Sequence, residues 1–349
     1  MESLKSKLDF AEHFSRLDKA TRKLTLCFVS LFEECNEKSI NSHTISQVNL
    51  RLLSEKGHLL TFKRPDMFEA IKSDLSLKYS LEFEKVGLKA ISSFPGFCSA
   101  HDTNLFKLID SANLEFSLDA VELLVFRTFV HEAYKKLCSQ YKTDSFSVVD
   151  TDAENDRLMV TEGFQLGYID LVVQAQKIYQ NLKSKKHDYK FLEIRFCSLL
   201  PFCFISPSNF EIKPSFGGKD PTAYTTYDSC LIGLIPTSSG SKFILAFPKS
   251  QQRNIKLFLK RLEPNKAQLP TQVLQLALES SENLYFQPSW VESISKEHRD
   301  ILGKLFHRDL SVMDVLGEKF LPDGLLHYAG NIYASSNMLI TRKWRESLS

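Results

Sequence analysis

Apolar residues recur at helical spacing in several parts of this chain. The pattern is strongest over residues 118–138, where an apolar residue returns every three or four positions. The residues that carry it are Leu118, Val121, Leu124, Val125, Phe129 and Leu137. A second long helix is expected over residues 158–182. Shorter helices are expected over residues 1–20, 101–110, 251–262, 271–280 and 296–306.

The pattern changes after the charged run KSKKHD, which ends at residue 188. The following runs FLEIRFCSLLPFCFIS, CLIGLIP and KFILAFP are apolar and bounded by Pro, Gly or Ser, which predicts β-strands. Residues 24–100 are irregular, with short helical or strand pieces expected at 48–54 and 58–62. We therefore expect an α+β fold in three parts. These are an N-terminal module over residues 1–110, a helical segment over 111–187 and a β-rich domain with peripheral helices over 188–349.

Composition and charge narrow the class of protein. The 349 residues are 43% hydrophobic and 25% charged, which is ordinary for a folded globular chain. With 44 basic and 42 acidic residues, the formal net charge of +2 gives no support for a nucleic-acid-binding protein. No apolar run is long enough to span a bilayer, and the start MESLKSKLDFAEHF is not a signal peptide. We therefore expect a cytoplasmic protein without a membrane partner.

The cysteine count argues against a disulfide framework. The chain has seven cysteines, an odd number, so metal ligation or burial explains them better than pairing does. Cys197 and Cys203 alternate with apolar residues in FCSLLPFC, which predicts that both pack in a core.

Four residues before position 110 have the chemistry of a zinc site. Cys98 and His101 form a C-x-x-H pair, and the preceding FPGF favours a sharp entry into that turn. Cys27 and Cys35 would complete three thiolates and one imidazole, a donor set that suits structural Zn²⁺. The long gap between the two pairs is acceptable, because closure entropy grows only slowly with loop length. Alternatively, Cys27 and Cys35 are ordinary buried thiols.

A histidine between the two pairs adds a family resemblance. His43 stands in the context SHTI, and CSAHD opens the helix expected after residue 101. Over residues 27–110 this order resembles zinc-stabilised treble-clef proteins of the HNH (ββα-metal) nuclease type. The resemblance implies that His43 is the general base, and that Asp102 and Asn104 lie near a catalytic Mg²⁺ or Mn²⁺. It also implies a bacterial defence or mobile-element setting.

Two other roles are open to His43: it could be a further zinc ligand, or a hydrogen-bonded structural residue. The β-rich part contains no catalytic constellation and therefore looks like a recognition or assembly domain. Two functions follow. The favoured one is a zinc-stapled binding or regulatory protein that acts on a protein or nucleic-acid partner; the alternative is an HNH-like metal-dependent nuclease.

Charged residues also occur on the strongest predicted helix. Arg127, His131 and Glu132 fall close to one face of it. Such groups usually form a solvated ladder on a helix surface, and we expect that here. The alternative is an inward-facing pair that binds an anion or connects the helix to the zinc module.

Overall fold

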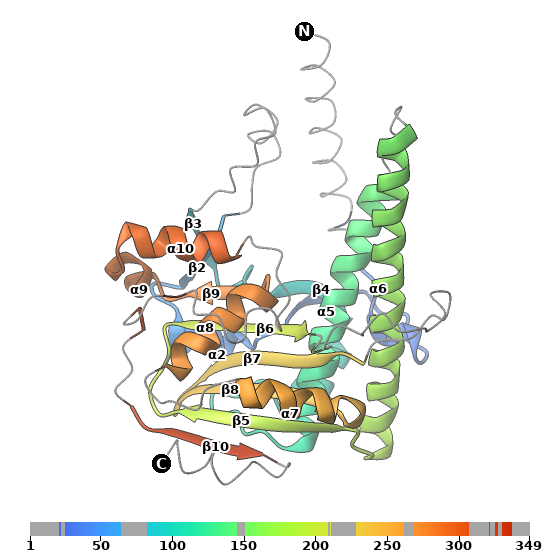
Figure 1. The fold of residues 1–349 in the computed structure, drawn as a ribbon. Coiled ribbons are helices and arrows are strands. Elements are labelled where there is room, and N and C mark those ends of the chain that lie inside the picture. Colours follow the sequence, from blue (N-terminus) through green and yellow to red (C-terminus); the bar gives the residue numbers. More distant parts are fainter. Residues whose placement is uncertain are drawn as a thin grey trace.

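The computed structural model describes residues 21, 25–63, 82–144, 151–208, 210, 228–261, 268–306, 321, 325–326 and 330–336. The helix expected over residues 1–20 lies outside them. The fold is a mixture of helices and strands, as the sequence predicts, built on an eight-stranded antiparallel sheet (Figure 1). None of the described helices is long and apolar enough to cross a membrane.

The large sheet has the strand order β10-β5-β8-β7-β6-β9-β2-β3. Its strands are β2 (His58–Phe62), β3 (Phe83–Gly87), β5 (Tyr189–Phe196), β6 (Phe202–Ser208), β7 (Cys230–Thr237), β8 (Gly240–Pro248), β9 (Leu284–Phe286) and β10 (Ile332–Ser336). Strands from both sides of residue 187 therefore share one sheet. The short strand β9 joins the two groups, because Phe286 pairs with Leu60 of β2 and with Phe202 of β6.

Helices and further apolar segments cover both faces of this sheet. The described helices are η1 (Phe28–Leu31), α2 (Gln47–Leu53), α4 (Ser99–Phe106), α5 (Leu118–Asp144), α6 (Thr151–Ser184), η2 (Lys249–Gln251), α7 (Gln252–Arg261), α8 (Leu269–Ser280), α9 (Pro288–Ser293) and α10 (Lys296–Phe306). One face packs with α7, α8 and α10, and the other with α5, α6 and the N-terminal third. Since both faces are covered, β7 and β8 are buried at every position and read as continuous apolar runs.

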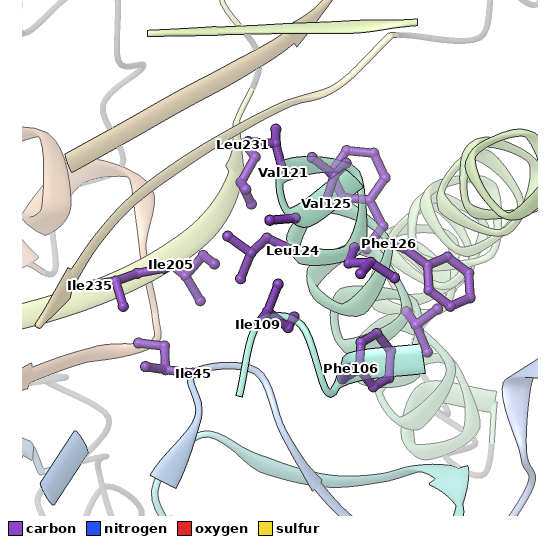
Figure 2. Packing of buried hydrophobic residues seen from close by; sticks show 14 of the residues in the cluster. Ile45, Phe106, Ile109, Val121, Leu124, Val125, Phe126, Ile205, Leu231 and Ile235 are labelled. Atoms are coloured by element: carbon purple, nitrogen blue, oxygen red, sulfur yellow. The ribbon is translucent and has the colours of Figure 1, made fainter. Parts of the chain in front are cut away.

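Helix α5 is the main support of the second face. Figure 2 shows Leu124 on α5 directed toward the sheet residues Ile205 and Leu231. Ile45 and Ile109, from the N-terminal third, lie beside them in the same apolar cluster. The core therefore joins the N-terminal third, the helical hairpin of α5 and α6, and the sheet.

The structure confirms most of the predicted helices and corrects several bounds. Residues 296–306 form a helix, as predicted. Residues 58–62, for which the sequence predicts either a short helix or a strand, form strand β2. The helix predicted over 118–138 continues to Asp144, and the helix predicted over 158–182 spans Thr151–Ser184. Cys203 is buried as expected, but the prediction for Cys197 is wrong: it is exposed, because β5 ends one residue earlier at Phe196.

Candidate metal centre

A small ββα unit carries two of the predicted zinc ligands, Cys98 and His101. Strand β1 (Ser39–His43) pairs antiparallel with β4 (Ser93–Cys98), and α4 begins directly after β4. The chain between the two strands contributes α2, β2 and β3, so the strand partners are far apart in sequence. Gly96 allows β4 to pass close to the Phe94 ring, because a Cβ at position 96 would lie 2.0 Å from a ring carbon.

The structure brings all four predicted ligands together. Cys27 precedes η1, Cys35 follows it, Cys98 caps the N-terminus of α4, and His101 lies in the first turn of α4. Their ligand atoms all lie within 4.8 Å of one another. His101 Nδ1 is 3.4 Å from Cys27 Sγ, 3.6 Å from Cys35 Sγ and 3.2 Å from Cys98 Sγ. In a tetrahedral zinc site such N···S separations are about 3.5 Å, given the usual Zn–N and Zn–S bond lengths.

Backbone N–H groups donate hydrogen bonds to the cysteine sulfur atoms of the centre, and burial affects the pKa of Cys27. The N–H of Cys98 donates to Cys27 Sγ at 3.3 Å, and the N–H of His101 donates to Cys98 Sγ at 3.4 Å. Burial raises the pKa of the Cys27 thiol to about 11, although the backbone hydrogen bond from Cys98 acts against this. Burial favours the protonated thiol, whereas a bound divalent cation would favour the thiolate, because a coordinating thiol releases its proton when the sulfur binds the metal. The donor set, its spacing and its burial therefore fit zinc.

A second layer of residues orients the histidine. Glu33 Oε1 lies 3.4 Å from His101 Nε2, on the ring edge that faces away from the sulfurs. Glu33 also pairs with Lys183 at the end of α6, and this contact is the main reason why the pKa of Glu33 is lowered. The arrangement resembles the carboxylate–histidine–metal relays that fix the ring orientation of zinc ligands. Through Glu33 the centre is also connected to α6.

His43 lies at the end of β1, half-buried, with hydrogen bonds on its ring. Gln47 Nε2 donates to His43 Nε2 at 2.9 Å, and the backbone of Leu88 accepts a hydrogen bond from the ring. Burial lowers the pKa of His43, and the positive charge of Arg127 lowers it further. The imidazole is therefore neutral near pH 7, and its unprotonated nitrogen already accepts a hydrogen bond from within the chain.

The charged residues of α5 do not form the expected solvated ladder. Arg127 is only 1% exposed, and its guanidinium donates to both carboxylate oxygens of Asp110 at 2.8 and 2.9 Å. It also lies 3.9 Å from Asp102 Oδ1 and 4.0 Å above the ring of Phe106. The expectation is wrong for Arg127 because the helix turns this residue inward, where it connects α5 to α4 and the turn that follows it.

His131 and Glu132, the other two residues of this predicted face of α5, do not share the surroundings of Arg127. His131 is buried and contacts Asn283 Nδ2 through Nδ1 at 3.1 Å. Glu132 pairs with Lys135 in the same helix at 3.1 Å, but these side chains are only 18% and 23% exposed, and Lys135 also pairs with Glu282, so the pair is not part of a solvated ladder.

The three residues that the family resemblance assigns to catalysis are placed differently. His43 and Asp102 are close enough to interact electrostatically, and Arg127 lies beside both. Asn104 is exposed on α4. It lies two positions after Asp102, which corresponds to about 200° around a helix, so the two side chains leave on different sides. Among the described residues, the four zinc-ligand candidates form the group of three or more metal-binding side chains that lies close together, and His43 and Asp102 are not part of it.

Comparison with protein-family models, with curated proteins and with solved structures found no match to this chain.

Proposed function

We propose that this chain is a binding or regulatory protein whose ββα unit is held by one structural zinc ion. The observation that carries the proposal is the convergence of Cys27, Cys35, Cys98 and His101, with all ligand atoms within 4.8 Å. Four protein ligands leave no open coordination position for a substrate or an activated water, which is typical of structural rather than catalytic zinc.

The location of the ligands supports a structural role. Cys27 and Cys35 flank the short helix η1, whereas Cys98 and His101 belong to the junction of β4 and α4. A metal bound to all four fastens the chain around η1 to the ββα unit. A 3-10 helix of four residues has few hydrogen bonds of its own to hold it in place.

The surroundings of His43 favour the binding or regulatory protein over the nuclease. Gln47 occupies the nitrogen with which a general base would take a proton. Asp102 lies beside the buried cation of Arg127, whose charge reduces the affinity of this place for Mg²⁺ or Mn²⁺. The favoured role of His43 is therefore the structural one.

Elemental analysis of the purified chain tests the zinc centre. We expect one zinc per chain in the wild type, and loss of zinc with loss of folded structure in Cys98→Ser. The matched control is Cys197→Ser, which removes an exposed thiol far from the centre in sequence and should keep both zinc and fold. A wild-type chain that folds without any metal would contradict the proposal.

The nuclease is the second candidate, and two observations favour it. The order β1, β4, α4 is a ββα order, and the lowered pKa of His43 keeps the imidazole neutral, as a base requires. We would incubate the zinc-loaded chain with plasmid DNA and RNA in the presence of Mg²⁺ or Mn²⁺. The variants are His43→Ala and, as a control, His58→Ala at an exposed position. We expect no cleavage by any of them; cleavage abolished only in His43→Ala would establish the nuclease instead.

A further inference from the structure

The three cysteines of the candidate zinc centre differ in how accessible they are from solution. Cys27 and Cys98 are only 1% and 2% exposed, whereas Cys35 is partly exposed. Cys35 also lies in the segment 34–38, which follows η1 and has no regular secondary structure. The susceptibility of a cysteine to oxidation follows its exposure and its thiolate character, and a zinc-bound sulfur is a thiolate. An oxidant that reaches the centre through solvent therefore meets Cys35 first.

Cys27 is well placed to react with an oxidised Cys35. The two side chains are within hydrogen-bonding contact of each other, and their sulfur atoms lie within 4.8 Å. Both cysteines flank η1, with seven residues between them. A disulfide needs the sulfur atoms to approach to about 2.05 Å. The irregular segment that carries Cys35 can supply this movement, because it has no strand or helix register to lose.

Cys98 is held more firmly than the other two cysteines. It is the last residue of β4, where it pairs with Ser39 of β1. It is also the N-cap of α4, and its sulfur accepts a hydrogen bond from the N–H of His101 at 3.4 Å. A movement of this sulfur toward another cysteine would disturb both the strand pair and the helix cap. Cys98 is therefore the least suited of the three to form a disulfide.

We propose that the zinc centre is a redox switch, in which a peroxide oxidises Cys35 and Cys27 to a disulfide and the zinc ion is released. This inference rests on the proposed structural zinc and adds a means of regulating it. The disulfide would hold the two ends of η1 together while removing two of the four ligands from the metal. Oxidation would therefore change how η1 is attached to the ββα unit.

The reaction balances with hydrogen peroxide as the oxidant. The Cys35 thiolate attacks one peroxide oxygen and the O–O bond breaks, which gives a sulfenic acid on Cys35 and a hydroxide ion. The Cys27 thiolate then attacks the sulfenic sulfur, the S–S bond forms and a second hydroxide leaves. Two protons from solvent convert both hydroxides to water. The two sulfur atoms lose two electrons in total, and the peroxide gains them.

Loss of two thiolates removes the basis of zinc binding. Cys98 and His101 remain as ligands, both at the junction of β4 and α4, whereas structural zinc takes four. The free energy of metal binding is also folding free energy, so the segment that the metal fastens becomes less stable when zinc leaves. That segment includes Glu33, which lies beside His101 and pairs with Lys183 of α6. The switch therefore acts where η1, α4 and the end of α6 meet.

Treatment of the zinc-loaded full chain with stoichiometric hydrogen peroxide tests the proposal. We expect one zinc released per chain, measured with a chromophoric indicator, and a disulfide between Cys27 and Cys35 in the peptide mass map. Dithiothreitol with added zinc should restore the zinc content. The variant Cys35→His keeps four ligands as two thiolates and two imidazoles. It should release zinc at least about tenfold more slowly, because the accessible thiolate is gone.

The matched control is Cys197→Ser, which removes an exposed thiol outside the centre and should release zinc as the wild type does. Hydrogen exchange reports the structural effect. The amides of residues 25–43 should exchange faster after oxidation, relative to those of β8, and should recover after reduction with zinc.

The outcomes separate this inference from the proposed function. A wild-type chain that carries zinc and keeps it after peroxide treatment overturns the switch alone, and so does a disulfide that contains Cys98. A folded wild-type chain purified without zinc overturns the switch and the proposed function together. If Cys35→His does not bind zinc, the disulfide map of the wild-type chain decides without it.

Discussion

At the scale of single residues, Glu33 is placed to affect metal binding at the proposed centre without being one of its ligands. Its carboxylate lies beside His101 Nε2 and so fixes which ring nitrogen faces the sulfurs. We expect Glu33→Gln to keep one zinc per chain but to weaken zinc affinity about 10- to 100-fold, the usual cost of losing such a partner. Competition with a chromophoric chelator measures this. Glu34→Gln, at the exposed neighbouring position, is the control; equal affinities in the two variants would contradict the prediction.

His43 should make the stability of the chain depend on pH. Its pKa in the fold is lower than that of a free histidine, chiefly through burial. The unfolded chain therefore binds the proton more readily than the folded one. This contribution to stability is complete above about pH 6.5, the ordinary pKa of histidine, and declines as the pH falls below it.

The variant His43→Gln removes this titration. With zinc in excess, its free energy of unfolding should fall less steeply below about pH 6.5 than that of the wild type, as measured by urea unfolding at a series of pH values. His58→Gln, which changes an exposed histidine, should follow the wild-type curve. Parallel curves for wild type and His43→Gln would show that His43 titrates as freely as a histidine in water.

At the scale of elements, one buried ion pair connects α5 to α4 and the following turn. Arg127→Met would keep the bulk of the side chain but leave Asp110 and Asp102 without their cation. We expect a loss of about 3–5 kcal/mol in the free energy of unfolding, because a buried charge without a partner is costly. Arg51→Met, at an exposed position of α2, is the control and should change stability by less than about 0.5 kcal/mol. If Arg127→Met and Arg51→Met lost similar amounts of unfolding free energy, the ion pair between Arg127 and Asp110 would not be important for stability.

The elements differ in how well the sequence predicts them. The bounds of α10 and β2 agree with the prediction because each is set by local pattern and nearby turn residues. The pairing of β1 with β4 could not be predicted, since Ser39 and Cys98 meet across the whole insertion of α2, β2 and β3. Strand β9 was also not predicted, because its three residues are held by the strands on either side of it rather than by their own pattern.

The residues of the candidate site also differ in how well the sequence predicts them. The four candidate ligands were predicted because thiol and imidazole chemistry restricts the choice of residues for a zinc site, whatever the fold. Glu33 and Lys183 were missed, because nothing in the sequence indicates that the end of α6 lies against the chain between Cys27 and Cys35. Arg127 was assigned to a solvated surface because helical spacing shows which residues share a face, but does not show what that face contacts.

At the scale of the whole molecule, the core crosses the boundary that the sequence predicts near residue 187. One face of the sheet is covered by α5 and by the N-terminal third, in contact with Ile205 and Leu231. The backbone N–H of Ser92 donates to the hydroxyl of Tyr285 at 2.9 Å, and both groups are buried. A chain cut at residue 187 would expose this apolar face and leave that backbone N–H without its partner.

We therefore expect residues 188–349 not to fold by themselves, even though they contain most strands of the sheet. Expressed alone, this fragment should aggregate or lack dispersed amide resonances, because the uncovered face exposes a large apolar area. Expressed together with residues 1–187, it should be recovered as a soluble complex, because the two fragments restore one core. A fragment 188–349 that is soluble and cooperatively folded on its own would instead establish the predicted boundary as that of an independent domain.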